Sequence, residues 1–311
     1  MTDTLDQLES AIRDKNEEVI VSVIQNHTNE ERVKLREDYK IKFGRDLFED
    51  FSNNFKDEFL TIIIGVFQSP VEYDVDLLNK SLDKFISDKD LITEVICFRS
   101  QRRLKLIKTK YQEKYGKDLV EDIKNKTSGD YQKIILNLLE DIRNKNKEPD
   151  LENCSKIADE LYTAGEGKIG TDEDVFTNYF TTLSKEELLE VCKSYHRKHA
   201  KTMLDVLHNE FSGKEKRLLD NVLYSLFTPS EYFAREIKDA IGGLLTDHKK
   251  LIRCIITRYS IDMKRIKKYF KRIYQKELLD EVKNNVKGSY GRILETLINQ
   301  NDYIGKIEYY N

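Results

Sequence analysis

The chain repeats one pattern of apolar residues four times, and this recurrence limits its possible folds more than any other feature. Four segments place apolar residues at i, i+1, i+4 and i+5, a spacing that forms one stripe along a helix. They read "VIVSVI" (19–24), "LITEVI" (91–96), "VFTNYF" (175–180) and "LIRCII" (251–256). A second stripe of the same kind follows each of them, beginning at Ile62, Ile134, Leu218 and Ile293. We therefore expect several short helices in each of four units, with each unit burying a face on its neighbours.

A third signal lies between the two stripes of each unit. It reads "YKIKFGRDL", "YQEKYGKDL", "YHRKHAKTM" and "FKRIYQKEL" in chain order. With Gly44, Gly116, Ala200 and Gln275 taken as equivalent points, the intervals are 72, 84 and 75 residues. The longest interval contains "RNKNKEPDLEN" (143–153), a polar stretch with a proline that is predicted to connect two halves of the chain.

The composition favours an all-helical protein and argues against nucleic-acid binding. The chain has three prolines, no tryptophan, and abundant Leu, Ile, Lys and Glu. Its 53 basic and 56 acidic residues leave a net charge of −3. Nucleic-acid binding as the main function needs a basic surface that displaces counterions, so we expect no nucleic-acid partner.

Targeting signals are missing from the sequence as given. The start, "MTDTLDQLESAIRDK", lacks the basic and apolar regions of a secretory signal. The most apolar run, "FLTIIIGVF" (59–67), is far shorter than the roughly 20 residues of a spanning helix. The four cysteines are Cys97, Cys154, Cys192 and Cys254. They are scattered and lack the paired spacing of metal ligands, which favours reduced thiols in a cytoplasmic protein.

Glycine is concentrated in one loop. Of the 13 glycines, three fall within six positions of "GEGKIGT" (165–171), which "DEDVF" follows. The loop could be only a turn between two helices. It also resembles a dinucleotide-binding fingerprint, but no strand is predicted before it and no alternation of strands and helices exists.

These motifs together resemble the annexin family. Annexins have four units of about 70 to 80 residues, each with a K-G-x-G-T-D loop before a helix and a "YGKDL"-like segment later. "AGEGKIGTDE" is similar to their third-repeat loop and "LTDHKKLIRCIITR" to their fourth-repeat helix. Loss of the loop glycines elsewhere resembles the divergent alpha-giardin branch.

The resemblance implies an all-α fold and no enzymatic activity. It implies four annexin-type repeats of about five short helices each, arranged as a shallow curved disc. The expected boundaries are 1–68 for repeat I, 69–142 for repeat II, 143–153 for the connector, 154–227 for repeat III, and 228–311 for repeat IV with a C-terminal tail. No Ser-His-Asp or cysteine-histidine arrangement suggests catalysis.

The same resemblance implies a calcium site in repeat III. Calcium takes 6 to 8 oxygen ligands, and glycine permits the positive φ angles that aim several carbonyls at one point. In annexins an acid lies about 40 residues after the last loop glycine, and Glu210 stands 40 residues after Gly170. The implied ligands are the carbonyls of Gly165, Lys168 and Gly170 with the Glu210 side chain. Thr171 would cap the next helix.

The other three loops depart from this pattern. In the first loop, Asp14 replaces the last glycine and Asn54 replaces the acid. In the second loop, Ile86 replaces that glycine and Lys126 replaces the acid. The lysine would place an ammonium near the ion's position, so that site should be inactive. In the fourth loop the corresponding residues form a weak second candidate for calcium, and they are Ile241, Gly243, Leu245 and Asn285.

The leading hypothesis is calcium-dependent binding to anionic, phosphatidylserine-like membranes by a cytoplasmic protein that is peripheral at inner membrane surfaces. Lys168 would add about 1 kcal/mol of attraction to an anionic surface. Ile169 and Leu244 could enter the interface, although Ile169 could equally pack inward as a loop anchor.

The second hypothesis is a cytoskeletal scaffold with little calcium dependence, associated with microtubules, flagella or an adhesive disc. The basic runs 99–110 and 264–274 are read as solvated helix faces, and the functional alternative is an electrostatic patch that binds acidic tubulin tails or membranes. His196, His199 and His208 are read as surface histidines rather than as a metal site.

Overall fold

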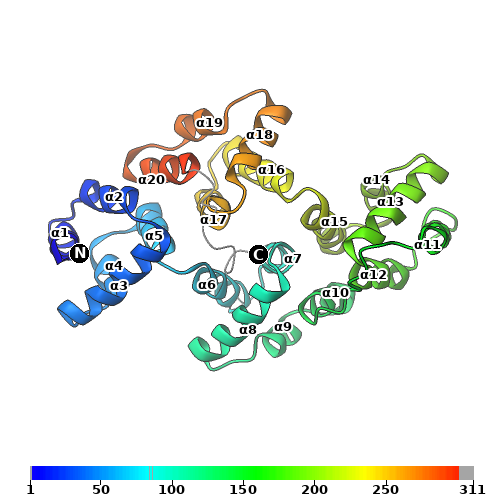
Figure 1. Ribbon diagram of the computed structural model, residues 1–311, viewed down its shortest axis with the longest axis horizontal. Coiled ribbons are helices and arrows are strands. Elements are labelled where there is room, and N and C mark those ends of the chain that lie inside the picture. Colours follow the sequence, from blue (N-terminus) through cyan, green and yellow to red (C-terminus); the bar gives the residue numbers. More distant parts are fainter. Residues whose placement is uncertain (1, 84, 86, 301–311) are drawn as a thin grey trace. The chain divides into compact units, whose positions relative to one another are not determined.

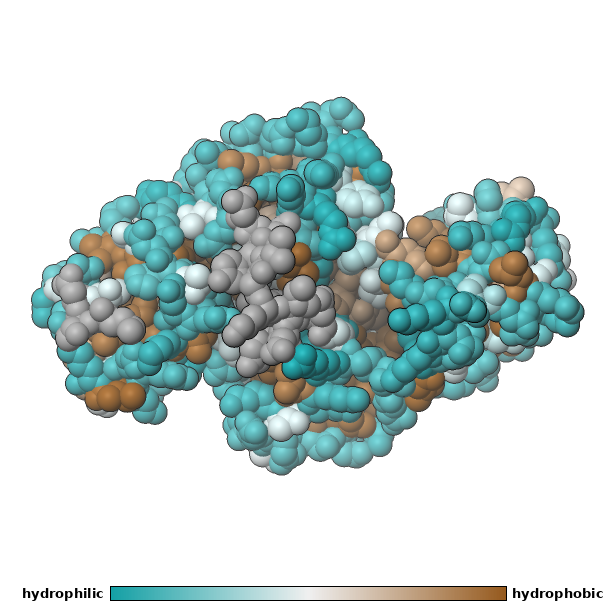
Figure 2. Space-filling model, viewed as in Figure 1, coloured by the Kyte–Doolittle hydropathy of each residue, from teal (hydrophilic) through white to brown (hydrophobic). Residues whose placement is uncertain are grey.

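The computed structural model describes residues 2–83, 85 and 87–300, and this part of the chain contains helices and connecting segments but no strand (Figure 1). The predicted all-α fold is confirmed. No helix among the described residues is long and apolar enough to cross a membrane. On the face drawn in Figure 2, hydrophilic residues predominate and hydrophobic residues lie in separate patches.

The described residues form twenty α-helices, which fall in chain order into four sets of five. The first set is α1 (Thr2–Arg13), α2 (Glu17–Asn26), α3 (Asn29–Phe43), α4 (Leu47–Asn54) and α5 (Asp57–Val66). The second is α6 (Pro70–Leu82), α7 (Lys89–Phe98), α8 (Gln101–Tyr115), α9 (Leu119–Lys126) and α10 (Gly129–Leu139). The third is α11 (Leu151–Ala164), α12 (Glu173–Thr182), α13 (Lys185–His199), α14 (Met203–Glu210) and α15 (Gly213–Phe227). The fourth is α16 (Pro229–Gly242), α17 (His248–Arg258), α18 (Met263–Tyr274), α19 (Leu278–Asn285) and α20 (Gly288–Asn299).

The third helix of every set ends in the same way. The residue after it adopts a left-handed conformation, with φ of 68° at Gly44, 66° at Gly116, 57° at Ala200 and 56° at Gln275. In each case its N–H donates to the carbonyl four residues earlier. The four points that the sequence suggested as equivalent therefore share one backbone conformation.

The predicted apolar stripes form the core. All four members of the second stripe are buried in every set: Ile62, Ile63, Val66 and Phe67; Ile134, Ile135, Leu138 and Leu139; Leu218, Leu219, Val222 and Leu223; Ile293, Leu294, Leu297 and Ile298. These stripes lie on the last helix of each set, α5, α10, α15 and α20. Removal of this apolar surface from water is the main force that holds the helices together.

The helices group into two compact units. Among the described residues, one unit contains those up to Tyr73 and those from Ser230 to Gln300, and the other contains those between Asp74 and Pro229. In the second unit α11 packs on α13 and α15 packs on α7; in the first unit α2 packs on α20 and α5 on α17. The segment before α11 carries the predicted connector, and α11 begins at Leu151, within its last residues.

Candidate functional site

The glycine-rich segment forms a closed loop between α11 and α12. The Asp172 N–H donates to the Ala164 carbonyl at 2.7 Å and joins the two ends of the loop. Inside it, the Gly167 N–H donates to the Tyr162 carbonyl at 2.7 Å. The loop is therefore held by backbone bonds at its base and near its middle, while its tip is exposed.

The three glycines of the loop are needed for different reasons. Gly170 has φ of 83°, which favours glycine. A Cβ at Gly167 would stand 2.9 Å from the Tyr162 carbonyl oxygen, and one at Gly165 would stand 3.1 Å from the Glu210 carboxyl carbon. The prediction that positive φ explains these glycines is right for Gly170 alone, since the other two permit close approach.

Glu210 lies against the loop, although 40 residues separate it from Gly170. The Thr171 hydroxyl donates to Glu210 Oε2 at 2.6 Å, and its distance to the Glu210 carbonyl oxygen is 3.3 Å. The prediction that Thr171 caps α12 is wrong, because Asp172 is the N-cap residue. Thr171 instead holds the Glu210 carboxylate beside Gly165.

The oxygen atoms around this loop suit a hard cation. The Gly165 carbonyl accepts one hydrogen bond, from Lys168 N–H at 3.0 Å. In the part of the chain that the structure describes, no hydrogen bond reaches the carbonyls of Lys168 or Gly170. Three carbonyls and one carboxylate are ligands that calcium accepts. Among the described residues, no three or more His, Cys, Asp and Glu side chains gather in a group that could hold a metal.

The second loop is closed by the same kind of backbone hydrogen bond, but a basic residue replaces the acid beside it. The Asp88 N–H donates to the Ser81 carbonyl at 3.0 Å, and the Ser87 hydroxyl donates to the Lys126 carbonyl at 3.1 Å. This last bond corresponds to the contact of Thr171 with the Glu210 carbonyl, so Lys126 occupies the position of the acid. Ile86 lies outside the described residues.

The fourth loop is closed by the Asp247 N–H, which donates to the Ala240 carbonyl at 2.8 Å. This loop is one residue shorter than the third loop, which the bond from Asp172 to Ala164 closes. Leu245 stands where Gly170 stands in the third loop, but it is not among the described residues with positive φ. The Asn285 amide turns away and donates to the Glu281 carbonyl of its own helix at 2.7 Å. Ile241 is buried and Gly243 is exposed.

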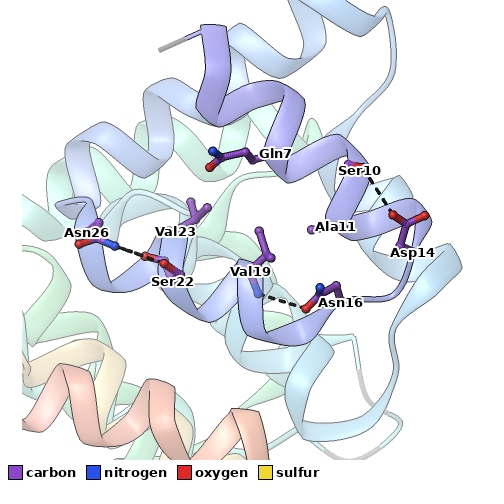
Figure 3. A pocket seen from close by; sticks show the side chains of 9 residues that line it. All are labelled: Gln7, Ser10, Ala11, Asp14, Asn16, Val19, Ser22, Val23 and Asn26. Atoms are coloured by element: carbon purple, nitrogen blue, oxygen red, sulfur yellow. Dashed lines mark hydrogen bonds between the residues drawn. The ribbon is translucent and has the colours of Figure 1, made fainter.

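The first loop has an amide, Asn54, at the position that Glu210 has beside the third loop. The Asn16 N–H donates to the Ala11 carbonyl at 2.8 Å, and the Asn54 amide donates to its own helix at the Asp50 carbonyl, 2.9 Å away. A cavity of about 460 Å³ lies beside this loop, between α1 and α2 (Figure 3). Its lining is mainly hydroxyl and amide side chains with one acid: Gln7, Ser10, Ala11, Asp14, Asn16, Val19, Ser22, Val23 and Asn26.

Large apolar side chains project from three of the loops. Ile169 in the third loop, Leu244 in the fourth and Phe85 in the second are fully exposed, and Leu245 is nearly so. The alternative that Ile169 packs inward is therefore wrong. The Lys168 ammonium is partly exposed and lies 4.0 Å from the Asp172 carboxylate.

Glu166 is a residue of the loop that sequence reasoning missed. Its carboxylate accepts the Tyr195 hydroxyl at 2.9 Å and the Lys201 ammonium. Burial raises the pKa of Glu166, but these hydrogen bonds outweigh that effect and lower it overall. No spacing in the sequence connects Glu166 with Tyr195 and Lys201, so only the folded arrangement identifies this contact.

Comparison with known proteins identifies the family. The Annexin family model matches residues 73–138, 157–221 and 232–297, which is more than half of the chain. Annexin A7 of Homo sapiens is 30% identical to this chain over 92% of this chain's length. The match spans 58% of the length of annexin A7. Annexin A13 of Mus musculus is 32% identical, with 91% of this chain and 89% of that protein covered.

Solved structures agree with this result. The structure of annexin III superposes with a TM-score of 0.89 at 27% identity, covering 96% of this chain and 94% of that one. The calcium-bound structure of alpha-14 giardin has a TM-score of 0.81 at 15% identity, covering 96% and 99%. At that identity the likeness to giardin concerns the fold alone.

Proposed function

This chain belongs to the annexin family, and from that membership we propose that it binds anionic phospholipid membranes in a calcium-dependent way, mainly through the loop between α11 and α12. Annexins in general bind phospholipids with calcium and act as binding proteins rather than enzymes. The repeat boundaries expected from the sequence, 1–68, 69–142, 154–227 and 228–311 with a connector at 143–153, are part of the proposal.

The observation that carries the proposal is the contact of Glu210 with the glycine loop. Its carboxylate lies where a Cβ at Gly165 would touch it, and Thr171 fixes one of its oxygens at 2.6 Å. The carbonyls of Gly165, Lys168 and Gly170 would complete the protein ligands. A single carboxylate leaves a divalent cation with net positive charge, which favours an anionic partner.

When calcium is bound, its open coordination positions would take phosphate oxygens of lipid headgroups. The chain itself would contribute further contacts around that point. Lys168 would add electrostatic attraction, reduced by the nearby Asp172 carboxylate. Ile169 and Leu244 are fully exposed and would enter the interface. We place the protein at the cytoplasmic surface of membranes, with phosphatidylserine-like lipids as partners.

We assign the fourth loop a weak calcium site at most, formed by Ile241, Gly243, Leu245 and Asn285. An amide oxygen there would have to leave the orientation in which Asn285 donates to its own helix. A membrane contact that depends on one good site should be weak for a single molecule and stronger when several bind together.

The proposal is tested by sedimentation with liposomes of phosphatidylserine and phosphatidylcholine over a calcium series. We expect calcium-dependent pelleting that Glu210→Gln removes. Glu186→Gln, which removes an exposed acid on α13, is the matched control and should pellet like the wild-type chain. Pelleting of Glu210→Gln at the same calcium concentration as the wild-type chain would reject the third loop as the site.

One observation supports the cytoskeletal scaffold as a second candidate. Helix α18 has no acidic residue and carries six basic ones: Lys264, Arg265, Lys267, Lys268, Lys271 and Arg272. Its apolar residues Met263, Ile266 and Phe270 are buried and Ile273 is half-buried, so the exposed surface of the helix is mainly charged. Such a surface suits acidic protein tails, including those of microtubules.

This second candidate makes a different prediction for cosedimentation. Binding to microtubules should persist in a calcium chelator, weaken with salt, and be lost in Arg265→Glu with Lys268→Glu. The same double variant should leave calcium-dependent liposome binding unchanged. Absence of microtubule binding at low salt would reject the candidate.

A further inference from the structure

Glu166 belongs to the third loop, but its side chain contacts the helices behind that loop. One oxygen, Oε2, accepts the hydroxyl of Tyr195 on α13 at 2.9 Å. The other, Oε1, accepts the ammonium of Lys201, with the Asn209 amide of α14 at 3.5 Å. The Glu166 side chain is only 10% exposed. Both oxygens therefore accept hydrogen bonds from donors of the protein scaffold.

The corresponding tyrosines in the first two sets have different partners. The Tyr39 hydroxyl donates to Asp50 at 2.7 Å, and the Tyr111 hydroxyl donates to Asp122 at 2.8 Å. Each of these acids is the fourth residue of the short helix that follows, α4 or α9. In α14 the fourth residue is Val206, which is buried. The fourth position of α14 therefore offers Tyr195 no acid.

The basic residue after the left-handed position also differs between sets. Lys117 of the second set binds Asp83, which directly follows α6. Arg45 lies 3.1 Å from Asp50 and Lys276 lies 2.7 Å from Glu281, and both acids are fourth residues of α4 and α19. Lys201 is the corresponding residue in the third set, and it contacts Glu166 instead. Tyr195 and Lys201 thus bind an acid of the glycine loop, whereas Tyr39 and Arg45 of the first set both bind Asp50 of the short helix.

We propose that Glu166 is a positioning residue, which ties the third loop to α13 and α14 and fixes the carbonyls beside it for an ion. The inference rests on the proposed calcium site at this loop. Glu166 lies between Gly165, whose carbonyl is an implied ligand, and Gly167, whose N–H binds Tyr162. A loop held at this point loses less freedom when its carbonyls converge on a cation, so affinity is higher.

The experiment compares Glu166→Ala with the double variant Glu166→Ala and Val206→Asp. The second substitution returns the acid to the position that it has in α4 and α9, where it can accept Tyr195 and Lys201. The double variant thus restores the partner of both donors but leaves the loop untied. Each chain is measured for its melting temperature, for hydrogen exchange of loop amides without calcium, and for calcium affinity by calorimetry.

We expect Glu166→Ala to lower the melting temperature, to speed exchange at residues 165–172, and to weaken calcium binding about tenfold. In the double variant the melting temperature should recover, while loop exchange stays fast and calcium binding stays weak. Recovery of loop protection and calcium affinity in the double variant would overturn the proposal, because Glu166 would then only stabilise the fold. Unchanged exchange and affinity in Glu166→Ala would also overturn it.

Two further measurements keep this result separate from the proposed function. Glu166→Gln retains the size of the side chain and tests the loop if the double variant does not fold; it should speed loop exchange, and normal exchange would contradict the proposal. Glu210→Gln is titrated alongside. If the wild-type chain and Glu210→Gln bind the same amount of calcium, the proposed calcium site at the third loop is rejected. The exchange of the ion-free loop still decides whether Glu166 orders it.

Discussion

The third and fourth loops are closed by the same kind of backbone hydrogen bond but differ in the side chain that lies beside the loop. Each joins two helices through a hydrogen bond from an aspartate N–H, 2.7 Å at Asp172 and 2.8 Å at Asp247. In the third loop a carboxylate lies against the glycines and a threonine fixes it. In the fourth loop the residue at that position is Asn285, which donates to its own helix.

This difference shows that the scaffold of the loop and its ion chemistry are separable. Leu245 lacks the positive φ of Gly170, and the fourth loop is one residue shorter, yet α16 and α17 are still joined and closed. The closing bond needs only a backbone N–H and a carbonyl. An ion needs converging oxygens and a charge, and the fourth loop has an amide, Asn285, at the position of the Glu210 carboxylate.

The largest expected effect comes from copying the fourth loop into the third. Gly170→Leu should weaken calcium binding by about 5- to 30-fold, because a left-handed conformation costs a residue with a Cβ about 1–2 kcal/mol. No atom lies within 4 Å of a Cβ at Gly170, so the variant tests φ alone. Gly170→Asn is the control, since asparagine tolerates this conformation, and calorimetry should show a smaller loss. Equal losses in the two variants would contradict the argument.

The reverse exchange should create a site. Leu245→Gly with Asn285→Glu gives the fourth loop a flexible residue and a carboxylate, so calorimetry should detect a second calcium ion. We expect it to bind about tenfold more weakly than the first, because the shorter loop holds its carbonyls less well. Leu245→Gly alone is the control and should add no site. A double variant with the wild-type stoichiometry would show that loop length decides the outcome.

A smaller effect is expected from the hydroxyl that fixes Glu210. Thr171→Val removes the donor at 2.6 Å and keeps the shape of the side chain. Loss of one hydrogen bond of about 1 kcal/mol should weaken calcium binding about fivefold. Thr171→Ser should bind as well as the wild-type chain. A serine variant as weak as the valine variant would assign the effect to packing of the methyl group.

The smallest expected effect separates stability from ion binding. Ala200 and Gln275 are the left-handed residues without glycine that follow the third helices α13 and α18, with φ of 57° and 56°. Gln275→Gly should raise the free energy of unfolding by about 1 kcal/mol and leave calcium affinity unchanged. Chemical denaturation and calorimetry measure the two quantities. A changed calcium affinity would mean that the differences between loops reflect overall stability.

Much of the fold could be predicted because its signals are local or periodic. The buried stripes that begin at Ile62 and Ile293 follow from helical spacing. The left-handed end at Gly44 is marked by its glycine, and Gln275 was found only because its flanking residues repeat the same pattern.

The candidate site was less predictable, because much of it depends on contacts across the fold. The 40-residue interval from Gly170 to Glu210 led to the acid through family resemblance. No pattern indicated that Thr171 holds Glu210 instead of capping α12, or that Gly167 is needed beside the Tyr162 carbonyl. The link from Glu166 to Tyr195 joins residues 29 positions apart, and no local or periodic pattern indicates it.

The most direct test of the central claim is a crystal structure of the full chain grown with calcium. We expect an ion at the third loop, bound by the carbonyls of Gly165, Lys168 and Gly170 and by the Glu210 carboxylate. The second loop should hold none, because Lys126 stands at the position of the acid. An empty third loop with calcium bound at the fourth would contradict the account.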